Sequence, residues 1–331
     1  MNIGYAIKRI FKLDFSRSFK DVARVADKSG KSRIKIFLDM IYCGIEYGAG
    51  PLDYELFEFY DRTRAQRKTY ITRGVNNALV KKLNAADKVH IFDNKPEFNE
   101  VFHKYINRGW LKTKGISFEE FEKLIENQDA IIYKPIDGTC GKGIEKLFLK
   151  DYTSKDLFEY ILSKPEGIIE QIVSQHSKLS QMYPLSLNTI RIVTIKDKDE
   201  VLPLCAFWRI GKDGNYVDNL NSGGIAARLD VNTGIVDMPA SDKAGKIFEK
   251  HPYSDVKIYG FQIPMWKEII ETVKGAANVL PDIRYVGWDV ALSENSVQLI
   301  EGNCFPGHDI LQLPSYTPNK TGFKPLVEKF L

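Results

Sequence analysis

Two stretches near the C-terminal end decide how the chain folds: Tyr285-Val-Gly-Trp-Asp-Val-Ala-Leu and Val297-Gln-Leu-Ile-Glu-Gly-Asn. Both are apolar and rich in β-branched or aromatic residues, which is typical of strands. Ser293-Glu-Asn-Ser between them is typical of a turn, so the three segments together predict a β-hairpin.

Three side chains with oxygen ligands lie in this hairpin: Asp289, Glu301 and Asn303. Side chains alternate between the two faces of a strand, so Glu301 and Asn303 should point the same way. A three-residue hairpin loop would place Asp289 directly opposite Glu301. Two facing carboxylates repel each other and resist desolvation. A hard cation such as Mg²⁺, which binds carboxylate and amide oxygens together with substrate phosphates, would stabilise them, so the trio predicts a metal site.

Composition places the chain among soluble globular proteins of one large or two to three small domains, with 331 residues, 44% hydrophobic and 27% charged. It contains no apolar run long enough for a transmembrane helix, and its first residues lack the pattern of a secretory signal. Its four cysteines are widely spaced, which predicts neither a zinc site nor a disulfide framework. A reducing, cytoplasmic location is therefore expected.

Charge is uneven along the chain, although the net charge is only +4. Ten basic residues face three acidic ones between Met1 and Lys35. Three interpretations remain open: a solvated helical face, attraction of an anionic substrate, or peripheral contact with an anionic membrane surface. The last is suggested by apolar residues at helical spacing beside the lysines, namely Ile7, Ile10, Phe11 and Phe15. Nucleic acid is not expected as a partner, because no recognition motif accompanies the charge.

The pattern of apolar residues divides the chain near residue 85. Residues 1–85 are expected to be mainly helical, whereas strands with helices in blocks follow from residue 86, which predicts an α+β fold with a largely antiparallel sheet. The expected helices are Ile34–Tyr42, Leu52–Arg67, Asn76–Leu83, Pro96–Phe102, Phe118–Glu126 and Met265–Leu280. The expected strands before the hairpin are Ala130–Pro135, Ile144–Leu149, Gly167–Val173, Thr189–Ile195 and Val201–Ile210.

A glycine-rich loop follows the first of these strands, in Tyr133-Lys-Pro-Ile-Asp-Gly-Thr-Cys-Gly-Lys-Gly-Ile. Glycines let backbone N–H groups approach an anion closely, and the threonine adds a hydroxyl donor. The loop matches neither a Walker P-loop nor a Rossmann turn, because a strand follows where each would have a helix. A flexible hairpin is the alternative, but Lys134 just before the loop favours phosphate binding.

Further polar side chains interrupt apolar strands. Glu170 and Gln171 end one strand and could hydrogen-bond a heterocycle, although a strand end explains them equally well. Arg191 lies within another strand, where an acidic site or a phosphate is the expected partner and a structural ion pair is the usual alternative. Arg209 ends the next strand. Asn219 belongs to a polar loop that ends in Gly-Gly, and turn chemistry alone could account for it.

Taken in this order, the motifs resemble those of the ATP-grasp superfamily. Ser186-Leu-Asn-Thr-Ile-Arg-Ile-Val-Thr and Val217-Asp-Asn, with Gly-Gly-Ile after it, look most like the sugar-transfer-associated ATP-grasp group. The likeness extends from about Lys88 to the end. It implies two α+β subdomains with largely antiparallel sheets that clasp ATP, preceded in the chain by a helical N-terminal region. The expected division is 1–85 and 86–331, with the latter split into about 86–180 and 181–331.

The resemblance also implies a nucleotide site. The first and second ATP-phosphate lysines would be Lys95 and Lys134, and the glycine loop would close over the triphosphate. Glu170, with the backbone of Gln171 and Ile172, would contact adenine, and His176 lies near the position that usually contacts the ribose. The expected loop contacts are Gly138, Thr139, Gly141 and Gly143.

At the reacting end, the resemblance implies that Arg191, Arg209 and Asn219 face the γ-phosphate and the acceptor. Asp289, Glu301 and Asn303 would hold Mg²⁺, with Glu301 bridging two ions. The cofactors expected are therefore ATP and two Mg²⁺ ions.

The activity that the resemblance implies is ADP-forming carboxylate–amine ligation through an acylphosphate. The substrates would be a small carboxylate, such as an amino acid, and an amine on a sugar or lipid-linked precursor, in the setting of cell-surface polysaccharide. A kinase that phosphorylates a hydroxyl group and a non-catalytic ATP-binding scaffold are the alternatives. His308, just after the metal strand, would orient a substrate, act as a base or simply hold its loop.

Overall fold

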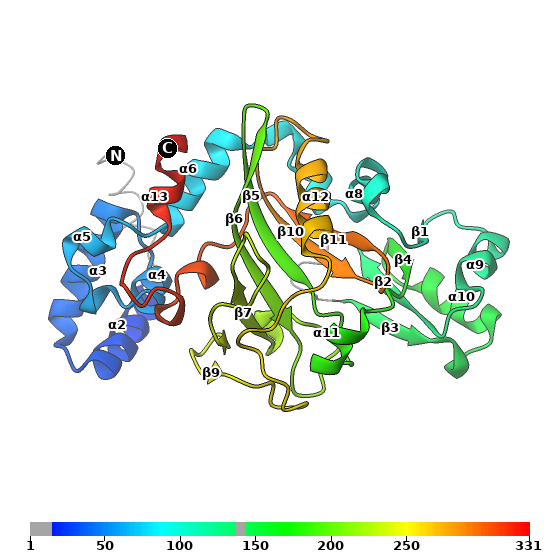
Figure 1. The fold of residues 1–331 in the computed structure, drawn as a ribbon, viewed down its shortest axis with the longest axis horizontal. Helices are drawn as coiled ribbons and strands as arrows, with labels where there is room; N and C mark the ends of the chain where they lie inside the picture. Colours follow the sequence, from blue (N-terminus) through cyan, green and yellow to red (C-terminus); the bar gives the residue numbers. More distant parts are fainter. Residues whose placement is uncertain (1–14, 137–142) are drawn as a thin grey trace. The chain divides into compact units, whose positions relative to one another are not determined.

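The computed structural model describes residues 15–136 and 143–331, so the loop residues Gly138, Thr139 and Gly141 lie outside it (Figure 1). Two compact units are present: the chain up to Leu83 together with Gly307–Leu331, and Asn84–Pro306. We expected the second region to continue from residue 86 to the C-terminus. The last 25 residues, Gly307–Leu331, instead belong to the helical unit.

Aromatic side chains form the core of the helical unit, among them Tyr54, Phe57, Phe59 and Tyr70. The single helix expected over Leu52–Arg67 is wrong. Glu58 adopts a left-handed conformation with φ of 52°, which ends the first helix, and a capping box between Thr63 and Gln66 begins another. The helices of this unit are α2 (Phe15–Ser29), α3 (Arg33–Tyr47), α4 (Pro51–Leu56), α5 (Arg64–Arg67), α6 (Arg73–Leu83) and α13 (Lys324–Val327).

Side-chain hydrogen bonds attach the C-terminal segment to this unit. The Gln312 amide accepts from Ile71 N at 2.7 Å and donates to Ile71 O at 2.9 Å. His308 Nε2 lies 2.8 Å from the Asp53 carboxylate, and both residues are buried. Asp53 also accepts backbone N–H groups of Gly50 and Arg73. His308 therefore has an acidic partner within its own unit, which favours a structural role over that of a substrate base.

The second unit contains a four-stranded antiparallel sheet of order β1-β4-β2-β3. Helices α9 (Phe118–Ile125) and α10 (Ser154–Ser163) cover the face that carries Ile131, Tyr133 and Ile169. Because side chains alternate along a strand, Lys134 and Glu170 lie on the opposite face. The strands are β1 (Trp110–Lys112), β2 (Ala130–Pro135), β3 (Glu145–Phe148) and β4 (Gly167–Gln171).

The second unit also contains a seven-stranded antiparallel sheet of order β11-β10-β5-β6-β7-β8-β9 (Figure 1). Ile192, Trp208 and Trp288 point into a large apolar core with α12 (Trp266–Ala277). The other helices of the unit are α7 (His90–Asp93), α8 (Lys95–Val101) and α11 (Ser177–Met182). The strands are β5 (Ile190–Asp197), β6 (Glu200–Ile210), β7 (Ile225–Leu229), β8 (Ala240–Ser241), β9 (Ile247–Phe248), β10 (Tyr285–Leu292) and β11 (Val297–Asn303). The expected α+β class with antiparallel sheets is confirmed.

The hairpin of β10 and β11 places Asp289 opposite Glu301, as expected, but the loop length and the strand register differ from those expected. Leu292 pairs with Val297, so the loop has four residues rather than three. A β-bulge then leaves Ile300 unpaired between the pairs Val290–Leu299 and Asp289–Glu301. Without that extra residue, the register would place Ile300 opposite Asp289. The bulge is therefore what sets the two carboxylates against each other.

Gly302, in β11, lies under the rings of Phe92 and Phe98, where a Cβ atom would approach ring carbons to 2.8 and 2.9 Å. We expect Gly302→Ala to lower the free energy of unfolding by about 1–3 kcal/mol because the rings must move. Gly44→Ala is the matched control. Its Cβ would meet only Ala49 O at 3.5 Å inside α3, so it should stabilise by up to about 1 kcal/mol. Chemical denaturation followed by circular dichroism measures both; equal effects would refute the packing of β11.

Candidate active site

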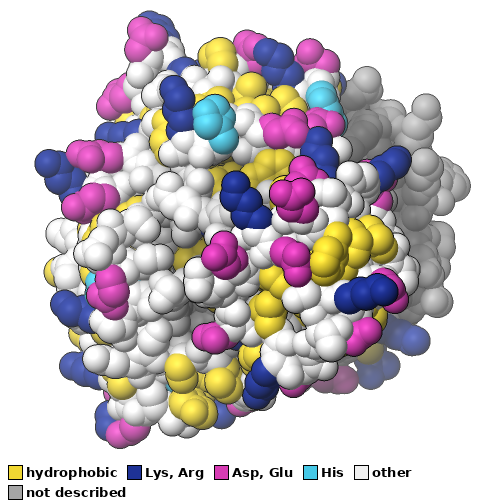
Figure 2. Space-filling model, turned by 90° about the vertical axis from the view of Figure 1, so that its right-hand side faces the viewer, with side chains coloured by type: hydrophobic (Ala, Val, Ile, Leu, Met, Phe, Trp, Pro, Cys, Tyr) yellow, Lys and Arg dark blue, Asp and Glu magenta, His cyan; other side chains and the backbone are white. Residues whose placement is uncertain are grey.

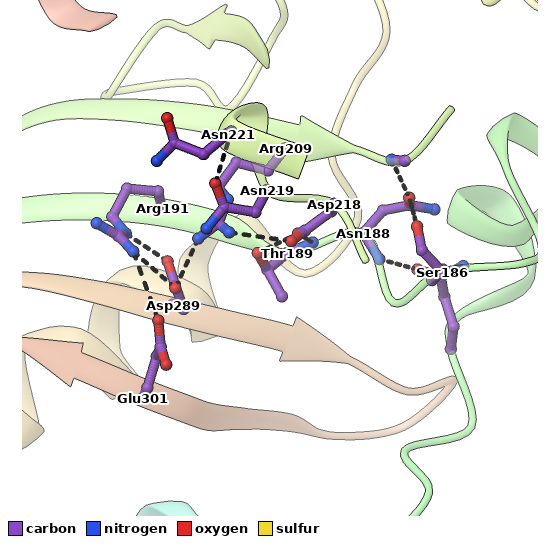
Figure 3. A network of polar contacts seen from close by, with 12 residues as sticks. Ser186, Asn188, Thr189, Arg191, Arg209, Asp218, Asn219, Asn221, Asp289 and Glu301 are labelled. Atoms are coloured by element: carbon purple, nitrogen blue, oxygen red, sulfur yellow. Dashed lines mark hydrogen bonds and ion pairs between the residues drawn. The ribbon is translucent and has the colours of Figure 1, made fainter. Parts of the chain in front are cut away.

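A buried carboxylate between two guanidinium groups is the centre of the candidate site (Figure 3). Asp289 is paired in register with Arg191 across β10 and β5, and Arg209 follows on β6. Both Arg191 Nε and NH2 donate to Asp289, the second at 2.7 Å, and Arg209 NH1 donates to Asp289 Oδ2 at 2.6 Å. All three side chains lie on the face opposite the apolar core, because they alternate with core residues such as Ile192 and Trp208.

Asp218 extends this network from the loop after β6. Its carboxylate accepts from Arg209 NH2 at 3.0 Å and from Thr189 N at 2.8 Å. We did not single out Asp218 from the sequence, although it stands in the Val217-Asp-Asn motif. Acidic and basic groups thus alternate from Asp218 through Arg209 and Asp289 to Arg191 (Figure 3).

These contacts fix the charge of Asp289. Burial alone would raise the pKa of this carboxyl, but the charges of Arg191 and Arg209 outweigh it and hold the pKa well below its usual range. For the neighbouring Glu301, desolvation and the negative charge of Asp289 raise the pKa to about 7. The Glu301 side chain is 58% exposed, so we give more weight to the charge of Asp289 than to desolvation. Arg191 NH2 lies 3.8 Å from Glu301 Oε1.

The arginines change the reason for expecting a cation here. We inferred a metal from the repulsion of two carboxylates, but Arg191 and Arg209 already compensate Asp289. Within residues 15–136 and 143–331, no group of three or more His, Cys, Asp or Glu side chains could hold a metal ion. The trio still fits one: Asp289 accepts three of about four bonds that a carboxylate can take, and Glu301 and Asn303 are exposed on one face.

The second cluster surrounds Glu170 on the uncovered face of the four-stranded sheet. Its carboxylate accepts from Lys134 Nζ at 2.5 Å, Arg108 NH2 at 2.8 Å and Asn99 Nδ2 at 3.1 Å. Desolvation would raise the pKa of Glu170, but the charges of Lys134 and Arg108 outweigh it and lower the pKa well below its usual range. Glu170 is therefore an anion that holds Lys134 in place. No motif in the sequence marked Arg108 or Asn99 as its partners.

Lys95 lies beside the described start of the glycine loop. It is the first residue of α8, and its Nζ donates to Pro135 O at 2.9 Å and Ile136 O at 3.2 Å. Gly143, the first described residue after the loop, has φ of 74°, and a Cβ there would approach Pro135 Cγ to 3.0 Å. The two ends of the loop thus meet at Pro135, next to both expected phosphate lysines.

The residues expected at adenosine have partners within the protein. The Gln171 side chain accepts from Gly109 N and donates to Leu124 O, both at 2.9 Å, and Ile172 follows the end of β4. His176 caps α11 by accepting from Lys178 N at 3.2 Å.

Two other expected site residues stabilise local turns. Asn219 Oδ1 accepts from Asn221 N at 2.9 Å, and Asn303 Oδ1 accepts from Phe305 N at 2.8 Å. Both are side-chain turns of the kind that asparagine favours. Asn219 directly follows Asp218 and so lies in the loop that contacts Arg209, whereas Asn303 lies two residues beyond Glu301 on the same face of β11.

Removing the charge of Asp289 should be costly for stability. Asp289→Asn removes a buried carboxylate and leaves two partly buried arginines without their anion, which we expect to lower the free energy of unfolding by about 3–5 kcal/mol. The matched control is Asp237→Asn, which removes a half-exposed ion pair with Arg228 at 2.8 and 2.9 Å. Its effect should stay below about 1 kcal/mol. If chemical denaturation gave equal effects, Asp289 would not be the centre of this network.

Comparison with known proteins places these features in a family context. The chain matches the family model described as sugar-transfer associated ATP-grasp over residues 74–330. Curated protein sequences give no significant match.

Solved structures that resemble the chain include two ligases and one synthase. ATP-grasp ligase PsnB, complexed with a minimal precursor, has 14% identity and a TM-score of 0.45, over 75% of this chain and 62% of that one. N5-carboxyaminoimidazole synthase from Aspergillus clavatus, with ADP and 5-aminoimidazole ribonucleotide, has 12% identity and a TM-score of 0.42, over 67% and 46%. L-amino acid ligase from Bacillus licheniformis has 12% identity and a TM-score of 0.42, over 73% of this chain and 47% of that one. The chain thus spans less than two thirds of the length of each of these proteins.

Proposed function

Because this chain belongs to the sugar-transfer-associated ATP-grasp family, we propose that it is an ATP-dependent, ADP-forming carboxylate–amine ligase. The observation that carries the proposal is the pair of buried charge clusters in one unit. Lys134 is held by Glu170 on one sheet, and Arg191 and Arg209 are held by Asp289 on the other. Cations that are fixed in place by buried carboxylates can stabilise the charge of a transferring phosphoryl group without reorganising.

The first cluster would bind the nucleotide. Lys95 and Lys134 would contact phosphates, and the backbone N–H groups of the loop with Gly138, Thr139, Gly141 and Gly143 would close over them. Since the Glu170 carboxylate is paired with Arg108 and Lys134, its proposed role is to position Lys134 rather than to contact adenine. Adenine would then meet the backbone of Gln171 and Ile172, with His176 toward the ribose.

The second cluster would bind the reacting end. Arg191 and Arg209, with Asn219 in the adjacent loop, would face the terminal phosphoryl group and the substrate carboxylate. Glu301, Asn303 and the remaining lone pair of Asp289 would hold Mg²⁺, with Glu301 shared between two ions. When bound, Mg²⁺ would neutralise charge on the phosphates.

Substrate chemistry follows from the reaction class. An oxygen of the substrate carboxylate would take the terminal phosphoryl group as ADP leaves. An amine would then attack the acyl carbon, displace phosphate and lose a proton. We propose an amino acid or another small acid as acyl donor, and an amine of a sugar-linked or cell-surface polysaccharide precursor as acceptor. The sugar setting rests on the family description alone.

Trapping the acyl intermediate tests this proposal. The full chain, incubated with ATP, Mg²⁺, a pool of carboxylic acids and hydroxylamine, should form an acyl hydroxamate and ADP. Glu301→Gln should lower that rate roughly 100-fold or more, because it removes the anionic metal ligand. Glu271→Gln, on the exposed surface of α12, is the control and should keep the rate.

Other outcomes would overturn the proposal. Phosphorylated alcohols without any hydroxamate would identify a kinase, and bound nucleotide without turnover across broad substrate pools would identify a scaffold. A Glu301→Gln variant with full activity would refute the metal assignment while leaving ligation possible.

A further inference from the structure

Apolar side chains follow one side of α3 that the described part of its unit, from residue 15 on, leaves exposed. Ile34, Leu38, Ile41 and Ile45 recur at steps of four, three and four residues, which places them on one helical stripe. Ile34 is 72% exposed, Leu38 59% and Ile45 44%. The opposite side of α3 is buried in the unit core through residues such as Ile36. The helix is therefore apolar on both sides, although only one is packed.

Helix α2 adds to this stripe. Phe19 is 63% exposed and stacks on Phe37 of α3, with ring centroids 6.2 Å apart. We call the combined area the α2–α3 surface; it consists of Phe19, Ile34, Phe37, Leu38, Ile41 and Ile45. An exposed apolar area of several neighbouring large side chains marks an interaction site more often than chance exposure does.

Exposed basic residues adjoin this surface in the sequence, together with one exposed acidic residue, Glu46, next to Ile45. Lys20, Arg33 and Lys35 are exposed beside it. Among described residues, no ion pair is recorded for Lys20 or Lys35, and Arg33 lies 3.6 Å from Asp27 with both side chains mostly exposed. Such an exposed pair contributes little and leaves the charge available.

The excess of positive charge is confined to the helical unit. This unit has 20 Lys and Arg residues against 11 Asp and Glu, whereas Asn84–Pro306 has 27 against 32. Figure 2 shows the side of the molecule that lies to the right in Figure 1, where α9 and α10 of the second unit are labelled. On this face, acidic and basic side chains are interspersed without an area of one sign. The helical unit is therefore the part of the chain that an anionic partner would attract.

Charge and apolar area together select the partner. Two copies of the α2–α3 surface would bring like charges together, which disfavours self-association. The phosphates of a nucleic acid would contact the basic side chains but not the aliphatic ones. An anionic lipid surface uses both, because basic side chains meet headgroups while apolar side chains enter the acyl boundary. No helix within residues 15–136 and 143–331 is long and apolar enough to cross a membrane.

We propose that the α2–α3 surface binds the interface of a membrane containing anionic lipids. Ile34, Leu38 and Phe19 enter the headgroup–acyl boundary, and Lys20, Arg33 and Lys35 contact the headgroups. This binding does not depend on the ligase reaction, so the two proposals stand or fall separately. It would keep the ATP-dependent unit close to lipid-linked substrates.

Vesicle sedimentation of the full chain tests this binding. The protein should sediment with vesicles of equal parts phosphatidylglycerol and phosphatidylcholine but not with phosphatidylcholine alone, and added salt should weaken the binding. Ile34→Gln with Leu38→Gln should weaken it at least about 10-fold, since several buried CH₂ groups are lost. Leu162→Gln with Ile247→Gln, at exposed sites of the second unit, is the matched control and should bind normally.

Four results would overturn this inference. The protein could fail to bind either vesicle, or bind both equally. It could instead bind RNA or DNA with no effect of Ile34→Gln and Leu38→Gln, which would identify a polyanion site. It could also form a dimer that these substitutions dissociate, which would make the α2–α3 surface an interface between two copies.

A second inference concerns Arg108, which contacts both Glu170 and the backbone of β11. Strand β11 is at the edge of its sheet, so its outer carbonyl groups have no neighbouring strand. Arg108 NH1 donates to Leu299 O at 2.7 Å, and Arg108 NH2 approaches Ile300 O at 3.5 Å while donating to Glu170. Ile300 is the extra residue of the bulge that aligns Glu301 with Asp289.

From this geometry we infer that Arg108 is a positioning residue for the proposed metal ligand Glu301. It ties the bulge of β11 to the carboxylate that holds Lys134, so the two ends of the site keep a fixed relation. Only a guanidinium has enough donors in one plane to reach a carboxylate and two carbonyl groups together. This inference rests on the proposed ATP site.

Binding of a non-hydrolysable ATP analogue, measured with and without Mg²⁺, tests this role. Arg108→Lys should weaken Mg²⁺-dependent binding about 10–100-fold, as loss of a residue behind a metal ligand does. It should change binding without Mg²⁺ much less. Arg228→Lys, at the ion pair with Asp237, is the control and should change neither.

Each outcome of this measurement has one meaning. If the unsubstituted chain binds no nucleotide, the ligase proposal fails. If it binds but Arg108→Lys keeps the full Mg²⁺ dependence, the role of Arg108 fails. Should Arg108→Lys not fold, Gln298→Leu removes an acceptor 3.2 Å from Arg108 NH1 and should produce a smaller loss in the same direction.

Discussion

Asp289 keeps a negative charge inside the seven-stranded sheet because guanidinium groups from two other strands reach it. Arg191 comes from the neighbouring strand in direct register, and Arg209 comes from the strand beyond. The register of three strands is thereby coupled to one charge: a slip by one residue would turn the arginines into the apolar core. The same constraint extends to the loop of Asp218, which binds the second arginine. The position of the candidate site follows from this single buried ion.

On the smaller sheet, Glu170 is likewise a buried carboxylate whose charge is compensated by cationic side chains, those of Lys134 and Arg108. In both clusters, a buried carboxylate orients the cations around it. Such an arrangement costs desolvation energy, and buried ion pairs add little net stability. Retaining two of them is better explained by preorganisation for an anionic substrate, since fixed charges need not reorganise during a reaction. For the helical unit, with its excess of basic residues, we propose a different kind of recognition.

Much of the fold could be predicted from the sequence because its signals are local. Alternating apolar residues identified the strands, and the hairpin residues placed Asp289 against Glu301. The bulge at Ile300 could not be predicted, because no local residue pattern marks it. The carbonyl groups beside it are contacted by Arg108, which comes from a distant segment of the chain. An acidic partner was expected for Arg191, but Asp289 was not identified as that partner, because the pairing of β5 with β10 joins distant segments. The metal was therefore inferred from a repulsion that the arginines relieve. The attachment of Gly307–Leu331 to the helical unit also arises from long-range bonds, such as those of Gln312.

A crystal structure of the full chain with Mg²⁺ and a non-hydrolysable ATP analogue tests the central claim most directly, because it locates the triphosphate relative to both clusters. We predict phosphate oxygens within hydrogen-bonding distance of Lys95 and Lys134, and a metal ion on Glu301 facing the Arg191 and Arg209 side chains. A nucleotide bound elsewhere, with the ion pairs of Asp289 and Glu170 unchanged and no metal at Glu301, would contradict the account.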